Sequence, residues 1–433
     1  MFRLPWIGFA LLASPVPAVV AASAPTPVAS ALVPASPALT LSDAVARALR
    51  GHPALKAAAY TLRVHDALRD QAGLKPAWQG TLEAENWLGA GRLNGVGALE
   101  TTLRLGTVIE RGGKRERRIG QADAEKALVA AGQDVARLDL LAEVARRYIH
   151  VVADQEGLAL TQQATVLATR AAQLVEQRVR AAKAGEAESG KAAIALARAE
   201  IAQEHAEHEL DSARVALAAT WNARVPGFDR AEAAFFDLPE PESLDSLVAA
   251  LEHSPDLTRF ISARRVEDAR LALARSHRTA DLTLNAGVRR LEAGNDQAFV
   301  LSLSLPLGNA ARAAPFEREA EWRRDAIDAE VDAVRADLYR TLYALYQELL
   351  HARTQADTLR TRVIPQAERT LQHTEAGYAL GRYSYLELVD AQQQLLTVQR
   401  EAVDAARDYH LFFVELERVA GRSLGLAVVE TVQ

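Results

Sequence analysis

The sequence has no cysteine and a single methionine among its 433 residues. The lack of cysteine excludes disulfides, thiolate metal ligands, a cysteine nucleophile and a lipid-modified N-terminal cysteine. Aromatic residues make up only 6% of the chain, and no stretch beyond the N-terminus reaches the roughly 18 uncharged apolar residues that a transmembrane helix needs. Lys and Arg number 50 against 56 Asp and Glu, so the charge balance gives no reason to expect a nucleic acid partner.

The N-terminus has the pattern of a secretory signal peptide. Arg3 supplies the positive start, an apolar stretch follows from Leu4 to Val20, and Ala22-Ser23-Ala24 forms a cleavage site. Together they predict a signal peptide over residues 1–24. Residues 25–39 are rich in Ala, Pro and Ser, which is typical of a linker that cannot bury enough apolar surface to fold. We therefore expect an exported protein.

The rest of the chain contains two copies of one plan. The segment "AVARALRGHPALKAA" around Pro53 resembles "LVAALEHSPDLTRF" around Pro255 at an offset of 202, and Gly185 matches Gly381 at an offset of 196. This predicts one repeat over residues 40–222, a connector over 223–242, a second repeat over 243–421 and a tail over 422–433.

Each repeat reads as a short helix, a helix, two strands, a very long helix, a tight turn and a final helix. Period-two alternation places the strands at about 81–88, 96–105, 281–290 and 298–305. The long segment from about 115 to 184 has no proline, and its apolar residues recur every three or four positions, as in coiled coils. Pro365 should kink or interrupt the equivalent helix of the second repeat.

The four strands raise the question of what they pack against. Alternating strands of about 8 to 10 residues in an exported protein are typical of transmembrane β-strands, and four strands cannot close, so several chains would have to share a barrel. Three copies would give about 12 strands and an open lumen. Glu83, Glu85 and Glu100 would then face water inside while the Leu faces meet lipid. The alternative is that the two hairpins pack one face on a soluble helical body.

Two segments carry a resemblance to a known family. "VIPQAERTLQHTEAGYALGRYSYLELVDAQQQLL" (Val363 to Leu396) resembles the tunnel-tip turn and returning helix of the TolC-like outer-membrane efflux ducts, and "TVIERGGKRERRIGQA" (Thr107 to Ala122) is similar to a stretch of their CzcC-like, heavy-metal branch, with Arg111 where that branch has Leu. The resemblance implies a mainly α protein with transmembrane β-strands. Duplicated long-helix hairpins would form a periplasmic α-helical barrel, and four strands per chain would enter a trimeric 12-stranded outer-membrane β-barrel. It also implies a homotrimer in the outer membrane that reaches into the periplasm, with a periplasmic adaptor (membrane fusion protein) and an inner-membrane RND-type pump as partners.

Glu387 and Asp390 lie three residues apart, on one face of a helix just after the turn at Gly381. In a three-fold assembly about six carboxylates would converge, favouring cations and resisting closure by like-charge repulsion. The resemblance places such residues at a periplasmic constriction. The alternative is a solvated helix face. The first repeat has Lys191 and Ile194 at the matching positions, so we expect only one repeat to build a gate.

Gly185 and Gly381 should supply the positive φ at which each long helix reverses. The resemblance implies that the surface around Gly185, Gly381, Ser384 and Leu386 meets the hairpin tips of the adaptor.

Other motifs carry little chemistry. "RGGKRERR" (residues 111–118) is not a phosphate-binding loop, because that motif needs Gly at position 108 and Ser or Thr at 115, where the chain has Val108 and Arg115. His205 and His208 lie on one helix face beside Glu204 and Glu209, with a spacing that metals can use, but two histidines without a fixed third ligand are usually surface residues. We expect no cofactor, no resident metal and no enzyme activity.

We therefore expect an outer-membrane duct that conducts heavy-metal cations passively. Two alternatives stay open: a duct for drugs or for type I secretion, and a soluble periplasmic helical scaffold or adaptor.

Overall fold

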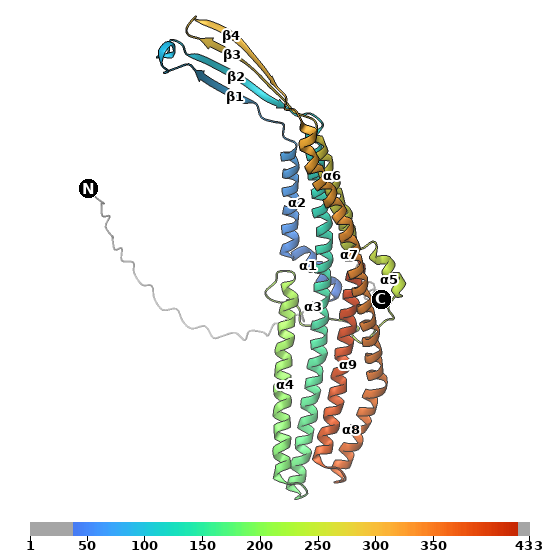
Figure 1. Ribbon diagram of the computed structural model, residues 1–433. Helices are drawn as coiled ribbons and strands as arrows, with labels where there is room; N and C mark the ends of the chain where they lie inside the picture. The colour runs from blue at the N-terminus through green and yellow to red at the C-terminus, as the bar shows by residue number, and fades with distance from the viewer. Residues whose placement is uncertain (1–37, 423–433) are drawn as a thin grey trace, which may run out of the picture. The chain divides into compact units, whose positions relative to one another are not determined.

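The computed structural model describes residues 38–422. The predicted signal peptide, most of the linker and the tail after Arg422 lie outside these residues. The element order repeats: two helices, two strands and long helices in the first half, then the same in the second half (Figure 1). The helices of the first half are α1 (Leu41–Gly51), α2 (Pro53–Ala72), α3 (Lys114–Arg180) and α4 (Glu186–Ala219). Those of the second are α5 (Leu244–Leu251), α6 (Pro255–Ser276), α7 (Asn309–Thr358), α8 (Ile364–Ala379) and α9 (Tyr385–Ala420).

The expected helix start signals are present. Thr40 and Ser243 cap α1 and α5, their hydroxyls accepting from the N–H groups of Asp43 and Ser246. Pro53 and Pro255 occupy the first turns of α2 and α6, where a missing backbone N–H removes no helical hydrogen bond. Leu39, expected to end the linker, is instead buried and forms a parallel bridge to Ala231 of the connector.

α3 has 67 residues, which corresponds to about 100 Å of helix. It begins shortly after a strand and ends at the turn into α4, so the sheet and this turn are separated by the whole length of the helix. Its counterpart is interrupted: a π-helical segment, η2 (Leu359–Val363), separates α7 from α8, and Pro365 lies in the first turn of α8. The chain therefore restarts its helix at the proline, as the sequence predicts.

The strands form one antiparallel sheet in the order β1-β2-β3-β4. Their bounds are β1 (Gln79–Glu85), β2 (Glu100–Ile109), β3 (Leu282–Leu291) and β4 (Asp296–Ser304), with a short 3-10 helix, η1 (Gly91–Leu93), between β1 and β2. The predicted strands at 81–88 and 96–105 are thus shifted. β1 ends early because Asn86 and Leu88 adopt positive φ, which removes them from an extended strand, and the loop between β1 and β2 spans residues 86–99.

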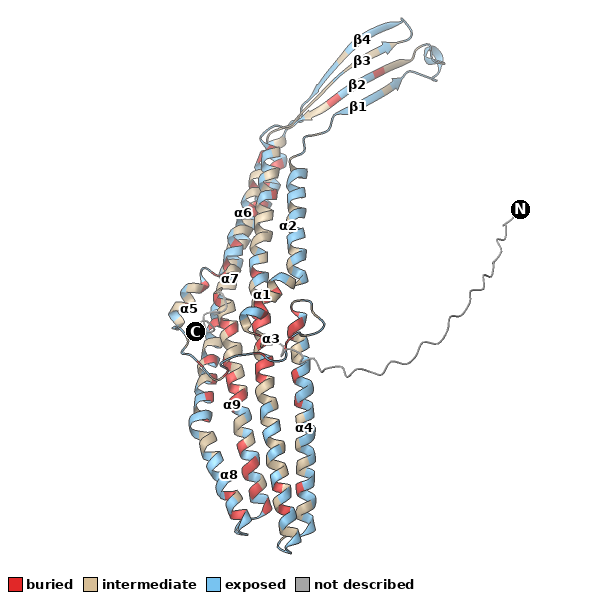
Figure 2. Cartoon of the chain, turned by 180° about the vertical axis from the view of Figure 1, so that it is seen from behind, coloured by how far each residue is buried: buried red, intermediate tan, exposed pale blue. Residues whose placement is uncertain are grey.

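The main hydrophobic core lies midway along the helices, where α1 and the connector pack on α3, α7 and α9. Figure 2 shows the buried residues concentrated there and near the α3–α4 and α8–α9 turns. Tyr148 of α3 donates to the carbonyl of Leu39 at 2.9 Å and also bonds the carbonyl of Glu232. Arg353 of α7 donates to the Leu238 carbonyl at 3.1 Å. The connector is therefore fixed to the helices by side chains that satisfy its backbone.

Candidate functional site: the sheet faces and the two helix-hairpin turns

The sheet gathers most of its large apolar side chains on one face and most of its charged side chains on the other. Cross-strand partners share a face, and the register pairs Leu82 with Leu103, Leu105 with Ala286, and Ala286 with Leu301. No element of the described chain covers this face, and its most exposed member, Phe299, is 94% exposed. Its other large exposed members are Leu82, Leu103, Leu105, Ile109, Val288, Leu301 and Leu303. An apolar surface of this extent marks a contact with lipid or protein.

The opposite face is polar and carries the three predicted glutamates, which are not free. Glu83 forms an ion pair with Arg104 at 2.7 Å. Glu85 and Glu100 both pair with Arg289, at 3.3 Å and 3.0 Å. The sequence places the acidic groups on the face opposite the leucines correctly, but it does not show that two arginines fold onto them.

The basic segment after β2 fastens the sheet to the helices. Lys114 is almost fully buried and pairs with Asp281 at 2.7 Å, while Arg118 pairs with Glu110 and donates to the carbonyl of Leu74 at 3.2 Å. The guanidinium of Arg118 donates to Glu110 and lowers the pKa of that carboxyl. These cations therefore anchor the strand-to-helix junction and do not present a basic surface.

The α8–α9 turn closes as a Schellman motif. Gly381, with φ 74°, donates its N–H to the Tyr378 carbonyl at 2.9 Å, and the next N–H, that of Arg382, reaches the Gly377 carbonyl at 2.8 Å. α9 then starts with a capping box. The Ser384 hydroxyl accepts from the Glu387 N–H at 3.3 Å, and the Glu387 carboxylate accepts from the Ser384 N–H at 2.7 Å.

The capping box gives Glu387 a structural role at the start of α9. The backbone N–H of Ser384, followed by its hydroxyl, donates to the Glu387 carboxylate and lowers its pKa. Asp390 accepts from Gln394 at 2.9 Å. Both carboxylates are exposed, whereas Tyr385 and Leu388 on the other side of α9 are buried. The structure thus places the two acids on one outward face, with Glu387 also ending the turn.

The α3–α4 turn corrects the predicted role of Gly185. Gly185 has φ −91° and is the N-cap of α4, while Ala182 adopts the left-handed conformation at φ 55°. The N–H groups of Ala182 and Lys183 donate to the carbonyls of Val179 and Arg178, at 2.9 Å and 2.8 Å, in the same Schellman pattern. The residue that reverses α3 is therefore Ala182, three positions before Gly185. The predicted alignment of Gly185 with Gly381 was wrong by these three residues.

The corrected register pairs Ala182 with Gly381 and Gly185 with Ser384, an offset of 199. Glu387 and Asp390 then correspond to Glu188 and Lys191, not to Lys191 and Ile194. The first repeat therefore has one of the two carboxylates, and Glu188 accepts from the Tyr378 hydroxyl at 3.3 Å.

One arginine connects the two turns. Arg178, in the last turn of α3, lies 4.4 Å from the centroid of the Tyr378 ring and also bonds the Tyr378 carbonyl. A second N–H of Arg178 reaches the Lys183 carbonyl at 3.4 Å. Burial, followed by the nearby Glu188 carboxylate, raises the pKa of Tyr378. A small apolar cluster that includes Val175, Tyr385 and Leu388 packs beside these groups. The two turns are thus held together within one chain.

Comparisons with known proteins agree with this geometry. A family model described as outer membrane efflux protein matches residues 44–223 and 247–422. The chain belongs to the outer membrane efflux protein family. It is 30% identical over 326 residues to the cobalt-zinc-cadmium resistance protein CzcC of Cupriavidus metallidurans, covering 74% of this chain and 77% of CzcC.

Solved structures share the fold. A CusC crystal structure superposes with a TM-score of 0.74 at 17% identity, covering 88% of this chain and 92% of CusC. A membrane protein from Pseudomonas aeruginosa superposes with a TM-score of 0.73 at 19% identity, covering 90% of this chain and 92% of that chain.

As a member of this family, the protein is an outer membrane efflux channel that extends into the periplasm, and it is not an enzyme. Within residues 38–422, no helix combines the length and the apolar character needed to cross a bilayer.

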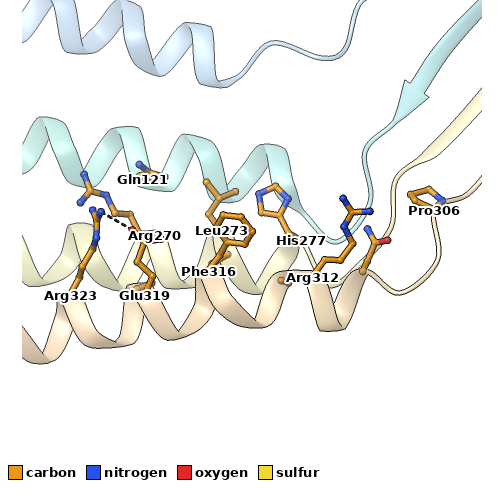
Figure 3. Close-up of a pocket in the computed structure, with 13 residues that line it drawn as sticks. Gln121, Arg270, Leu273, His277, Pro306, Arg312, Phe316, Glu319 and Arg323 are labelled. Carbon is orange, nitrogen blue, oxygen red and sulfur yellow. Dashed lines mark ion pairs between the residues drawn. The ribbon is translucent and has the colours of Figure 1, made fainter.

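Two further features are a pocket between helices and the two predicted surface histidines. A pocket of about 620 Å³ lies among α3, α6 and α7, and Figure 3 shows Arg323 paired with Glu319 in it, at 2.7 Å. His205 and His208 are exposed and approach Glu209 and Glu204 at 3.3 Å and 3.8 Å. The described part of the chain holds no group of three or more metal-ligating side chains arranged for a metal ion.

Proposed function

We propose that three copies of this chain close one 12-stranded barrel in the outer membrane and continue as a tunnel into the periplasm. The observation that carries the proposal is the open four-stranded sheet with one largely apolar, uncovered face. β1 and β4 are the sheet edges and have no further partner strand in the described chain. Unpaired edges are not tolerated in hydrocarbon, and three such sheets joined edge to edge have none.

The strand lengths support the same assembly. β2 and β3 have 10 residues each, which corresponds to about 33 Å of strand. Tilted by about 40°, such strands span roughly 25 Å, the height of the apolar band of outer-membrane barrels. The helices also have uncovered apolar side chains, such as Tyr60 and Val64 of α2 and Trp322 of α7, which neighbouring copies would bury.

The test of the assembly is membrane fractionation followed by sizing in mild detergent. We expect an outer-membrane protein that elutes as a detergent-stable trimer and conducts ions in planar bilayers. A soluble monomer would contradict the proposal and favour a periplasmic scaffold.

We propose heavy-metal cations as the cargo. The support is the 30% identity to a protein named for cobalt, zinc and cadmium resistance. The test is deletion of the gene followed by challenge with zinc, cobalt, cadmium and copper, with drug challenge in parallel. Unchanged metal tolerance with increased drug sensitivity would replace the metal assignment with a drug duct, and reduced secretion of a protein would indicate a type I secretion duct.

We propose that the α3–α4 and α8–α9 turns, with Gly185, Gly381, Ser384 and Leu386, dock a periplasmic adaptor that links the channel to an inner-membrane RND-type pump. The support is exposed apolar surface at this end: Leu386 and Leu380 are 76% and 70% exposed. Because the chain has no cysteine, a single Leu386→Cys can be cross-linked in cells without a background. We expect capture of an adaptor by Leu386→Cys and none by the control Ala326→Cys, an exposed position in α7. Equal capture by both would contradict this docking site.

We propose that Glu387 and Asp390 of the three copies line the periplasmic end of the tunnel and favour cations there. Both are exposed on one face of α9, and carboxylate rings select cations. Glu387→Gln keeps an acceptor for the Ser384 N–H while it removes the charge, so it separates selectivity from helix capping. We expect Glu387→Gln and Asp390→Asn to lower the cation preference measured as a reversal potential. An unchanged potential in the double variant would show that these acids face away from the ion path.

A further inference from the structure

Five charged side chains form ion pairs on the polar face of the sheet and are here called the charge row: Glu83, Glu85, Glu100, Arg104 and Arg289. The register sets Glu85 directly opposite Glu100, a like-charge pair that destabilises a sheet when nothing lies between the two groups. Arg289 on β3 resolves this conflict. Its guanidinium donates to Glu100 at 3.0 Å, to Glu85 at 3.3 Å and to the Thr102 hydroxyl at 2.9 Å.

Arg289 is held firmly in this position. Its side chain is 29% exposed, and Thr102, directly opposite it on β2, is completely buried beneath the row. Asn86 adds a hydrogen bond to Glu100 at 3.0 Å. Several charge-assisted hydrogen bonds from one planar group fix its orientation, so Arg289 spans three strands as a polar strut.

The charge row carries one net negative charge per chain, and Asp296, which the register puts on the same face, lies outside it. Its three carboxylates face two guanidinium groups, and each carboxylate is within ion-pair distance of one of them. A lumen lined by free carboxylates would favour cations strongly, but paired charges contribute little field beyond their own separation.

We propose that Arg289 keeps the cation preference of the barrel low, because its guanidinium pairs with the carboxylates of Glu85 and Glu100. The barrel then passes cations and anions with little preference, and selection between ions occurs at the periplasmic end. This rests on the three-chain barrel proposed above, in which the polar face lines the lumen. Loss of Arg289 would double the net negative charge of the row, from one to two per chain.

The test is the reversal potential of the reconstituted channel in a KCl gradient. We expect Arg289→Gln to raise the ratio of K⁺ to Cl⁻ permeability by about threefold, because two carboxylates per chain become free to face the ion path. The matched control is Arg290→Gln. Arg290 is the next residue on the same strand but belongs to the opposite face, where it pairs with Glu292 at 2.6 Å, so its loss should leave the ratio unchanged.

The opposite change gives a second arm. Glu85→Gln removes one carboxylate, while Arg289 retains its hydrogen bonds to Glu100 and Thr102. We expect this variant to lower the ratio of K⁺ to Cl⁻ permeability. If Arg289→Gln does not form channels, Glu85→Gln and Arg289→Lys carry the test. An unchanged ratio in Glu85→Gln, or an equal shift in Arg290→Gln and Arg289→Gln, overturns the proposal. Failure of the barrel itself is a different result, since the unaltered protein would then form no channel.

Discussion

The α3–α4 and α8–α9 turns have the same backbone geometry with different sequences. In both, a Schellman motif is followed three residues after its left-handed position by the N-cap of the returning helix. The α8–α9 turn has Gly381 and Ser384 at these positions, the residue types each prefers. The α3–α4 turn has Ala182, which is strained at positive φ, and Gly185, which makes no side-chain cap.

The difference shows that packing along the hairpin determines where a helix reverses, while local sequence only adjusts the cost. The left-handed conformation costs a non-glycine residue about 1 kcal/mol. Val175 and Leu388 are buried around the turns, and full burial of such a side chain contributes about 1.5 to 3 kcal/mol. Four sets of variants test this comparison, with local stability measured by hydrogen exchange of the turn amides in the detergent-solubilised protein.

The largest expected effect comes from the buried ring of the second turn. Tyr378 is 1% exposed and packs edge-on against Tyr385 at 6.4 Å between ring centroids. We expect Tyr378→Ala to lower the local stability of the α8–α9 turn by about 3 kcal/mol, because it leaves a cavity. Its counterpart Val179→Ala removes fewer atoms and should cost about 1 kcal/mol. Equal effects would show that the two turns depend equally on packing.

The link between the turns is next. We expect Arg178→Ala to cost about 2 kcal/mol, because it removes the stacking on Tyr378 and charge-assisted bonds to two carbonyls. Exchange should increase at both turns, although the substitution lies in only one. The control Arg180→Ala removes an exposed pair with Glu176 and should change stability by less than about 0.5 kcal/mol. A response confined to the α3–α4 turn would contradict the link.

Exchanging the residue types at the two left-handed positions should destabilise the α8–α9 turn and stabilise the α3–α4 turn. We expect Gly381→Ala to destabilise its turn by about 1 kcal/mol, and Ala182→Gly to stabilise the other by up to about 1 kcal/mol. A Cβ at Gly381 meets only the tip of Arg178, at 3.8 Å, so the effect reports backbone strain alone. Destabilisation by Ala182→Gly would mean that Ala182 is not strained in solution.

The smallest effects come from the caps. Ser384→Ala should cost about 1 kcal/mol, whereas Gly185→Ser should add only a few tenths. The cap of α9 should also depend on pH. The pKa of Glu387 is lowered in the folded state because the Ser384 N–H and hydroxyl donate to its carboxylate, so its contribution is complete above the ordinary glutamate pKa and is lost as the pH falls through the lowered value. After correction for intrinsic exchange rates, the amides after Ser384 should lose protection there, and those after Gly185 should not.

Much of the architecture could be predicted from the chain. Period-two alternation located all four strands to within a few residues, and Pro365 located the break in the second long helix. The β1–β2 loop could not be bounded, because Asn86 and Leu88 continue the period-two alternation of the strand although both adopt positive φ. The two turns were misaligned because a glycine signals a turn without saying whether it serves as the left-handed residue or as the N-cap.

The sequence by itself determined the element order, the separation of polar and apolar residues between the faces of the sheet, and the acidic residues after the second turn. These follow from local periodicity, which each segment carries within itself. Only the tertiary structure decided which charges cancel: Arg289 lies some 200 positions beyond Glu85, and pairing of β2 with β3 brings it between two carboxylates that the sequence left free. It also decided that Ala182 reverses a long helix, because packing between the helices offsets the cost of a left-handed alanine, which the local sequence does not reduce.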